Sequence, residues 1–341
     1  MDTRITIKEI AELSGVGIST VSRVLNKRPD VNDATRERVM EVIRRVGYEP
    51  NVNAKHLKQL STESVAVIVR GRNNLFFSGL LELLQARIQE TGLRFLPYYI
   101  GEEDDEVQEA QRVYAERKVR GIIFLGGCHA DWDDKLRVLP IPCVYSTVNA
   151  ASSKAENVSS VSVDDRRGAR QAVDYLFSCG HRELLILGGE TQGWNTANQR
   201  YKGVCDSFRA RGRQLEEARY LTSPFSFADA YKAIRSYNGP SYTAVFAMSD
   251  TMAIGACRAL LDMGLQIPRD VSVIGYDGIE LTAYCQPVLA TIRQPQEALA
   301  RESVSLLLRG MEQPCAVIAI SPWTDLTGSG ASYEANRDKD P

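Results

Sequence analysis

The chain has 341 residues, of which 44% are hydrophobic and 25% charged, and a formal net charge of −2 at pH 7. This length allows two or three domains with sizeable cores, and the composition is that of an ordinary folded protein. Seven scattered cysteines without a C-x-x-C pair, and only three histidines, argue against a disulfide framework or a metal cluster, so we expect reduced thiols, no metal and no other cofactor. No apolar run reaches transmembrane length and the N-terminus lacks a signal-peptide core, so we expect a cytoplasmic protein without membrane contact.

The charge is unevenly distributed along the chain. Residues 1–60 carry 11 Lys or Arg against 8 Asp or Glu, a net of +3, whereas the remainder carries 30 against 35. A basic head on an acidic body is typical of a DNA-binding module carried by a regulatory domain, although a charge cluster is more often only a solvated face.

Residues 7–26, IKEIAELSGVGISTVSRVLN, have the spacing of a helix-turn-helix. Thr6 and Glu9 form a capping box that opens a helix over about 7–13, Gly15 supplies the turn, and a second helix follows over about 17–25. The contact between the two helices is expected from Ile10, Ala11, Val16, Val21 and Val24. The face left exposed has short polar groups and one guanidinium, which suit the major groove of DNA: Ile18, Ser19, Thr20, Ser22 and Arg23.

Two further segments complete the N-terminal part. Asn32 can cap a third helix, whose apolar positions recur with helical spacing before Gly47 stops it: Val39, Val42, Ile43 and Val46. After a breaker at 48–51, residues 52–58 place Ala54 and Leu57 one helical turn apart. This last segment is too short to be a stable helix by itself.

From Ser64 onward, short aliphatic strands alternate with amphipathic helices. A first series predicts strands at VAVIV, FLPYYI, GIIFLGG and PCVYS, with helices around 80–88 and 105–118 and a weak helix before 142. A second series predicts strands at VSSVSVD, ELLILGG, near Tyr220, TAVFAMS and VSVIGYD, with helices over 166–179, 195–211, 227–236 and 250–263. Such alternation indicates parallel sheets buried on both faces, and two series indicate two similar lobes with a cleft between them.

Taken together, these motifs resemble the LacI/GalR family of bacterial transcription regulators over residues 4 to about 313. The resemblance rests on VGISTVSRVLN, VNDATRERV, GYEPNVNAKHL, GHRELLILGG, AMSDTMAIGA, SVIGYDGIE and ATIRQP. It implies an all-α helix-turn-helix headpiece, a hinge helix, and an α/β two-lobed core with parallel sheets, like that of periplasmic sugar-binding proteins. It also implies a homodimer, which we favour over a tetramer because the C-terminus has no leucine heptads.

The resemblance implies a headpiece at 1–50, a hinge helix and linker at 51–63, and an effector-binding and dimerisation core at 64–326. The chain is expected to cross between the lobes near 147–149, near 291 and near 312–316. The first lobe would then hold about 64–147 and 292–312, and the second lobe about 149–290 and 316–326.

For DNA recognition, Arg23 can donate to guanine, while Ser19 and Ile18 offer short polar and apolar contacts. The resemblance adds phosphate contacts near the helix ends, and this chain departs from the family at Gly17, where a serine commonly caps the recognition helix. The alternative is a corner of two helices without a DNA role. The expected DNA contacts are Thr6, Ile7, Gly17, Ile18, Ser19, Thr20, Ser22, Arg23, Asn26, Ala54, Leu57 and Lys58.

Leu57 is the sharpest of these expectations. A leucine on a marginal helix, beside the basic Lys55 and Lys58, has the character of an apolar wedge. By resemblance, the hinge helices of a dimer enter the minor groove and paired leucines kink the central base step, at a cost of a few kcal/mol that the added contacts offset. The alternative is a leucine that docks the headpiece onto the core.

A small-molecule effector is expected at the strand ends between the lobes, because ligands bind there in open α/β sheets. Carboxylates and a guanidinium suit vicinal hydroxyls, and aromatic rings suit pyranose faces, so we expect a sugar or a sugar phosphate. A nucleobase or an amino acid stays open. One of the two adjacent phenylalanines could belong to the core, and Asp250 could instead cap its own helix. The expected effector contacts are Phe76, Phe77, Thr147, Trp194, Arg200, Phe225, Asp250 and Asp277.

The C-terminal tail departs from the family. Residues from about 316 resemble an internal segment of hormone-sensitive-lipase-like α/β-hydrolases, with chance similarity as the alternative. An esterase would need a G-x-S-x-G elbow and a histidine late in the chain; neither occurs, so we expect no catalytic residues and no enzyme. AVIAI can still form a strand, and residues 327–341 are expected to be poorly ordered.

The sequence therefore predicts a ligand-responsive transcription regulator, a repressor of carbohydrate-utilisation genes that binds a pseudopalindromic double-stranded operator as a homodimer. The competing hypotheses are a solute-binding protein with the same core and, more remotely, an esterase. A solute-binding protein would have no use for the headpiece, and the esterase hypothesis rests on the tail alone.

The wedge hypothesis gives a direct test. A Leu57→Ala variant should bind operator DNA much more weakly, because the alanine side chain is too short to unstack a base step, while effector affinity stays unchanged. Gel-shift titration measures the first quantity and calorimetry the second. Equal operator affinity for the variant and the parent chain would contradict the wedge hypothesis.

Overall fold

The computed structural model describes residues 7–25, 31–46, 63–71, 74–101, 104–127, 135–150, 153–192 and 195–312, and the backbone of 317–320. The chain divides into two compact units, Met1–Ser61 and Thr62–Pro341. The predicted hinge segment lies outside the described residues, as does most of the tail.

The first unit contains three helices, α1 (Ile7–Ser14), α2 (Ile18–Leu25) and α3 (Asp33–Val46). They enclose a small core of the apolar residues expected from the helical spacing: Ile10, Ala11, Val21, Val24, Val31, Val39, Val42 and Ile43. Gly15 has a φ of +66° at the turn, a backbone conformation that glycine adopts without steric cost. The side chain of Asn32 accepts a hydrogen bond from the backbone N–H of Thr35 at 2.8 Å and so caps α3 as predicted.

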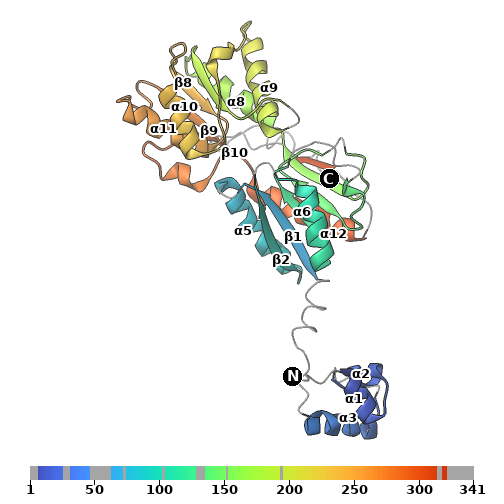
Figure 1. The fold of residues 1–341 in the computed structure, drawn as a ribbon. Helices are drawn as coiled ribbons and strands as arrows, with labels where there is room; N and C mark the ends of the chain where they lie inside the picture. The colour runs from blue at the N-terminus through green and yellow to red at the C-terminus, as the bar shows by residue number, and fades with distance from the viewer. Residues whose placement is uncertain are drawn as a thin grey trace. The chain divides into compact units, whose positions relative to one another are not determined.

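The second unit is built from two lobes, each a parallel sheet between helices (Figure 1). In the first lobe the strand order is β11-β5-β4-β3-β1-β2. The strands are β1 (Ser64–Arg70), β2 (Arg94–Ile100), β3 (Gly121–Leu125), β4 (Cys143–Ser146), β5 (Val158–Val163) and β11 (Val317–Ile320). Helices α5 (Leu75–Glu90) and α12 (Gln296–Glu312) cover one face, and α6 (Glu106–Arg117) covers the other.

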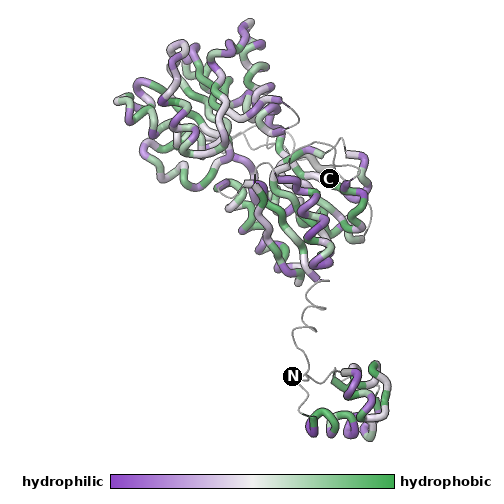
Figure 2. Tube along the Cα trace, viewed as in Figure 1, coloured by the Kyte–Doolittle hydropathy of each residue, from purple (hydrophilic) through white to green (hydrophobic). Residues whose placement is uncertain are grey.

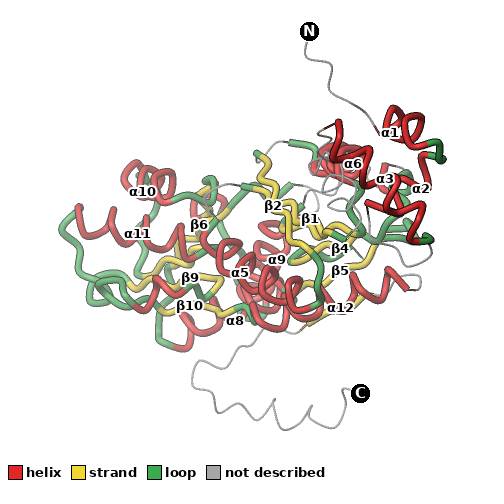
Figure 3. Tube along the Cα trace, turned by 90° about the horizontal axis from the view of Figure 1, so that it is seen from below, coloured by secondary structure: helices red, strands yellow, loops and turns green. Residues whose placement is uncertain are grey.

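In the second lobe the strand order is β10-β9-β8-β6-β7. Figure 3 shows β9 between β10 and β6. The strands are β6 (Leu184–Gly188), β7 (Tyr220–Thr222), β8 (Ala244–Ala247), β9 (Ser272–Asp277) and β10 (Ala290–Arg293). Helices α8 (Asp165–Ser178) and α9 (Thr196–Arg209) cover one face, and α10 (Phe227–Ser236) and α11 (Asp250–Asp262) cover the other. Two 3₁₀ turns, η1 (Glu217–Arg219) and η2 (Glu280–Ala283), lie in the connections.

The interior of each lobe is mostly hydrophobic, as Figure 2 shows by colour. Every residue of β3, β6 and β8 is buried, because helices cover both faces of the sheet. The prediction of an α/β core with parallel sheets is confirmed. Among the helices of the described residues, none has both the length and the apolar character needed to cross a bilayer.

The expected boundary between the lobes was wrong at its first crossing. Strand β5 pairs with β4, with Cys143 opposite Val158, and so belongs to the first lobe. The chain crosses to the second lobe only after Val163, not near 147–149. The error arose because alternation of strands and helices does not say which sheet a strand joins, and the β4–β5 connection returns to the same sheet edge.

The other two expected crossings also need correction. Strand β10 pairs with β9 in the second lobe, so the return crossing lies at 294–295 rather than near 291. Strand β11, expected in the second lobe, pairs with β5 in the first, so no crossing occurs at 312–316. The short strand from AVIAI therefore fills an edge position beside β5.

Helices α8 and α9 approach closely at Gly203. A Cβ at this position would lie 2.0 Å from the backbone carbonyl oxygen of Arg166 on α8. Only a residue without a side chain allows this approach, so Gly203 fixes how the two helices pack.

We expect Gly203→Ala to lower the free energy of unfolding of the core by roughly 1–3 kcal/mol, because the helices must separate to admit the methyl group. Urea unfolding followed by circular dichroism measures the change. Lys202→Ala, at the neighbouring exposed position, is the control and should change it by less than about 0.5 kcal/mol. Equal effects of the two variants would contradict the packing argument.

Candidate functional site

Helix α2 of the first unit presents the expected DNA-facing residues. Val21 and Val24 are buried against α1 and α3, whereas Ile18, Ser19 and Arg23 are exposed and Thr20 and Ser22 half-buried. Ile18, at the start of α2, is 49% exposed and lies outside the hydrophobic core of the first unit. Its exposure beside a hydroxyl and a guanidinium matches a surface for base edges.

Gly17 precedes α2 and accepts hydrogen bonds at its carbonyl from the backbone N–H groups of Thr20 and Val21, at 2.9 and 3.1 Å. A Cβ at Gly17 would meet only the Ser19 hydroxyl, at 3.5 Å, an ordinary contact. The site therefore has room for a capping side chain, and packing does not explain the glycine.

In the core, Arg200 is the centre of a buried polar cluster. Its Nε donates to Asp165 Oδ1 at 2.8 Å, its Nη1 donates to the Met248 carbonyl, and its Nη2 lies 3.4 Å from Asp277 Oδ1. Its Cζ lies 3.7 Å from the centre of the Tyr276 ring. Burial alone would lower the pKa of Arg200, but the Asp165 and Asp277 carboxylates outweigh it and raise that pKa.

Asp277 ends strand β9 with a φ of +114°, a strained value for a residue with a side chain. Its Oδ1 accepts from Gln294 Nε2 at 2.8 Å and faces Arg200. Burial raises the pKa of Asp277 to about 7, with Asp250 adding to the rise and Arg200 opposing it. Gln294 belongs to the return crossing between the lobes, so Asp277 ties that crossing to Arg200.

Asp250 is fully buried and does not act as either prediction stated. Its Oδ2 accepts from the backbone N–H groups of Gly278 and Ile279 at 2.7 and 2.8 Å, and its Oδ1 accepts from the Thr291 hydroxyl at 2.5 Å. Ser249, rather than Asp250, caps α11. Asp250 therefore holds the turn after β9, and we withdraw it from the effector contacts.

Of the predicted aromatic effector contacts, one belongs to the core and two lie on glycines near strand ends. Phe76 is buried in the first-lobe core and is withdrawn from the effector contacts. Phe77 is half-buried and rests on Gly126, where a Cβ would lie 3.2 Å from its ring. Phe225 rests on Gly189 in the second lobe, where a Cβ would lie 2.6 Å from its ring. Each lobe thus seats one ring on a glycine that closely follows a central strand.

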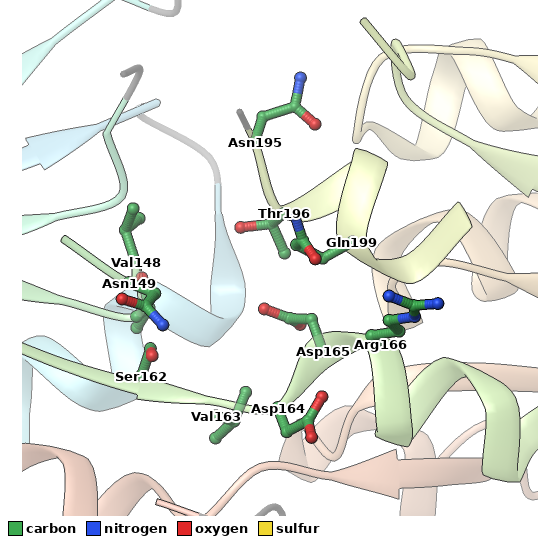
Figure 4. A pocket seen from close by; sticks show the side chains of 11 residues that line it. Val148, Asn149, Ser162, Val163, Asp164, Asp165, Arg166, Asn195, Thr196 and Gln199 are labelled. Atoms are coloured by element: carbon green, nitrogen blue, oxygen red, sulfur yellow. The ribbon is translucent and has the colours of Figure 1, made fainter. Parts of the chain in front are cut away.

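A cavity of about 300 Å³ lies between the lobes (Figure 4). The first lobe contributes the ends of β4 and β5, and the second lobe contributes the N-termini of α8 and α9. Its lining residues are Thr147, Val148, Asn149, Ser162, Val163, Asp164, Asp165, Arg166, Asn195, Thr196 and Gln199. Thr147 is the one predicted effector residue among them, and its φ of +80° places it at a sharp turn after β4.

Sequence reasoning missed most of this lining. Ser162 and Asp164 lie in the motif VSSVSVD and Asp165 directly follows it. Once the motif is placed at the end of a first-lobe strand, these residues are expected at the cavity, so the misplaced crossing hid them. Asn195 accepts a hydrogen bond from the backbone N–H of Asn198 at 2.7 Å and caps α9. This cap could have indicated the second-lobe wall of the cavity.

Several predicted contacts lie outside the described residues: Thr6, Asn26, Ala54, Leu57, Lys58 and Trp194, together with the side chain of Ile7. The described residues also contain no group of three or more His, Cys, Asp or Glu side chains placed to hold a metal ion.

Residues 6–51 match the family described as bacterial regulatory proteins, lacI family, and residues 157–321 match a periplasmic binding protein-like domain. The HTH-type transcriptional regulator MalR of Clostridium butyricum is 34% identical over 309 residues, which span 88% of this chain and 91% of MalR. The chain belongs to the LacI family. The HTH-type transcriptional repressor PurR of Vibrio vulnificus is 32% identical, over 89% of this chain and 91% of PurR.

Solved structures agree with this LacI-family assignment. A complex of the transcriptional regulator CelR with cellobiose is 29% identical, covers 94% of this chain and 98% of its own, and superposes with a TM-score of 0.69. The Lac repressor dimer bound to operator and an anti-inducer is 23% identical, with a TM-score of 0.66 over 94% of this chain and 97% of its own, and supports the fold.

The buried carboxylate of Asp277 should make the stability of this LacI-family core depend on pH. Because its folded-state pKa of about 7 lies above the unfolded value, the folded chain holds the extra proton below that pH. Its contribution to stability is therefore present in acid and is lost as the pH rises through about 7.

We expect Asp277→Asn to flatten the fall in unfolding free energy between about pH 5 and pH 8, measured by urea titration at each pH. Asp270→Asn is the matched control: hydrogen bonds lower the pKa of this exposed aspartate, so its titration lies below the window. Parallel pH profiles of the parent chain and Asp277→Asn would rule out the assignment.

Proposed function

We propose that this chain is a ligand-responsive transcription regulator, a repressor that binds a pseudopalindromic operator as a homodimer and is controlled by a carbohydrate held between the lobes. The observation that carries the proposal is the pairing, in one LacI-family chain, of an exposed recognition helix with an interlobe cavity lined by hydroxyl and amide groups.

The DNA-binding part of the proposal is supported by α2. Its buried side anchors it to α1 and α3, while Arg23 and Ser19 lie on its exposed side. One arginine and a few short side chains give little discrimination, since a good bidentate contact is worth about 1–3 kcal/mol. Two headpieces in a dimer double the set of contacts, and this favours a pseudopalindromic operator.

The effector part is supported by the position of the cavity. A polyol that bonds Asn149 and Ser162 on the first lobe and Thr196 and Gln199 on the second would bind one arrangement of the lobes better than another. A ligand shifts a conformational equilibrium only by this difference in affinity. Relatives named for cellobiose complexes and for a ribose operon support a sugar as the effector class.

The proposal gives the protein no catalytic role and places it in the cytoplasm, where its DNA would be. Support comes from the relatives, which are named regulators or repressors over about nine-tenths of this chain. The proposal includes the hinge role of Leu57, and the support for that role comes from the sequence alone.

Arg23→Ala tests the proposal. Loss of a bidentate donor to guanine should weaken specific operator binding by roughly 10- to 100-fold at moderate salt, with little change in the binding of unrelated DNA. Gel-shift titration against operator and scrambled duplexes measures both affinities.

Arg45→Ala is the matched control, because it removes the same charge from the exposed side of α3. It should weaken binding to the operator and to the scrambled duplex by the same factor, and so leave the ratio of the two affinities unchanged. The proposal fails if full-length protein shows no preference for any operator, or if Arg23→Ala keeps the preference of the parent chain.

A further inference from the structure

Helices α8 and α9, with the turn that follows α9, carry an excess of positive charge. Residues 165–178 and 196–213 hold eight Arg or Lys against three Asp, a net of +5. The rest of residues 61–341 holds 22 Arg or Lys against 32 Asp or Glu, a net of −10. The excess therefore belongs to this pair of helices, which lie side by side at Gly203, and not to the core in general.

The first half of the charge cluster on this surface is built around Asp206 on α9. Asp206 accepts two hydrogen bonds from Arg166 on α8, Nε to Oδ2 at 2.5 Å and Nη2 to Oδ1 at 2.9 Å, and one from Arg209 Nη1 at 3.0 Å. The hydrogen bonds from Arg166 hold the pKa of Asp206 below its usual value, so this carboxylate is charged at neutral pH. Two positive charges thus share one negative charge.

The second half of the cluster is built around Asp174 on α8. Its Oδ1 accepts from Arg211 Nη1 and from the Ser207 hydroxyl, each at 2.5 Å, and its Oδ2 accepts from Arg170 Nε at 3.4 Å. The charge of Arg170 also acts on Asp206, so the two halves form one cluster. Again two guanidiniums share a single carboxylate.

We call the four arginines of this cluster the arginine face: Arg166, Arg170, Arg209 and Arg211. Their side chains are 36–75% exposed, whereas those of Asp206 and Asp174 are 19% and 34% exposed, so the carboxylates lie lower than the guanidiniums that they hold. Each arginine keeps at least one Nη group that makes no hydrogen bond to another described residue. Exposed ion pairs contribute little to stability, so stability does not account for four arginines on two carboxylates.

The composition of the arginine face favours protein carboxylates over nucleic-acid phosphates as its ligands. Its cations are all arginines, and a guanidinium binds a carboxylate through two parallel N–H groups. Arginine and tyrosine are enriched where proteins bind one another, and lysine is depleted. Tyr175, next to Asp174 on α8, is exposed and adds such an aromatic residue. The 14 residues of each helix extend over about 21 Å, the length of about four helical turns.

We propose that the arginine face is a docking surface for an acidic segment of another protein, whose Asp or Glu carboxylates bind the outward Nη groups of the four arginines. The surface is separate from the recognition helix α2, so this proposal does not depend on operator binding. A partner docked there would contact the same two helices whose N-termini line the interlobe cavity.

The test uses the full-length chain and fluorescein-labelled poly-L-glutamate, with fluorescence anisotropy as the readout. The double variant Arg170→Glu/Arg209→Glu reverses one charge on each helix. It should bind the polymer at least roughly tenfold more weakly than the parent chain, because repulsion replaces attraction at two of the four contacts. At about 0.1 M salt, the Debye length of about 10 Å confines this effect to charges near the bound polymer.

The double variant Arg117→Glu/Arg235→Glu is the matched control. It makes the same change in net charge at exposed positions on α6 and α10, away from the arginine face. Its affinity should stay within about twofold of the parent, and any binding of the polymer by the basic headpiece is common to all three proteins. If the glutamate variant of the face does not fold, glutamine replaces glutamate at both pairs of positions, and the face variant should still lose at least roughly threefold.

Three outcomes would overturn the proposal. The parent chain could fail to bind poly-L-glutamate, or the face variant and the control could lose affinity equally, which would reduce the effect to net charge. The face variant could also keep its affinity for the polymer but lose more affinity than the control for a scrambled DNA duplex, which would assign the face to phosphates. An operator gel shift with the face variant reports the proposed function separately, since α2 is unchanged.

Discussion

The ion pairs of Arg200 join the two chain segments that connect the lobes. Asp165 stands directly after the first crossing between the lobes, and Asp277 accepts from Gln294 on the return crossing. One buried guanidinium therefore links both connections through two carboxylates. Taking such charges out of water costs several kcal/mol each, and only full hydrogen bonding offsets that cost. Any ligand that changes the surroundings of Asp165 acts on the point where both crossings meet.

The same constraint explains why the second lobe is so tightly built near its strand ends. Asp250 holds the backbone turn after β9 and the Thr291 hydroxyl on β10, which fixes where Asp277 is presented. Gly203 lets α9 approach α8 closely enough for Arg200 to reach Asp165. Neither Asp250 nor Gly203 lines the cavity, but Gly203 helps to place Arg200 against Asp165, which does line it.

The elements of the fold could be predicted from the sequence because buried parallel strands and amphipathic helices have distinct hydrophobic periods. Which sheet each strand joins could not. VSSVSVD looks the same whether it opens a new lobe or extends the old one, and only its pairing with β4 decides. The misplaced crossing then hid Ser162 and Asp165. Arg200 on α9 and Asp277 at the end of β9 were predicted as effector contacts, yet they are buried against each other and are not among the residues that line the cavity. Asp250 and Phe76 likewise show that position in the sequence alone does not distinguish a contact from a support.

The exposed side of α2 and the interlobe cavity obtain binding specificity in different ways. On α2, one guanidinium and a few small side chains give modest discrimination for each headpiece, so specificity must come from repetition. In the cavity, hydroxyls and amides from two lobes surround one space, so discrimination comes from matching many weak bonds at once.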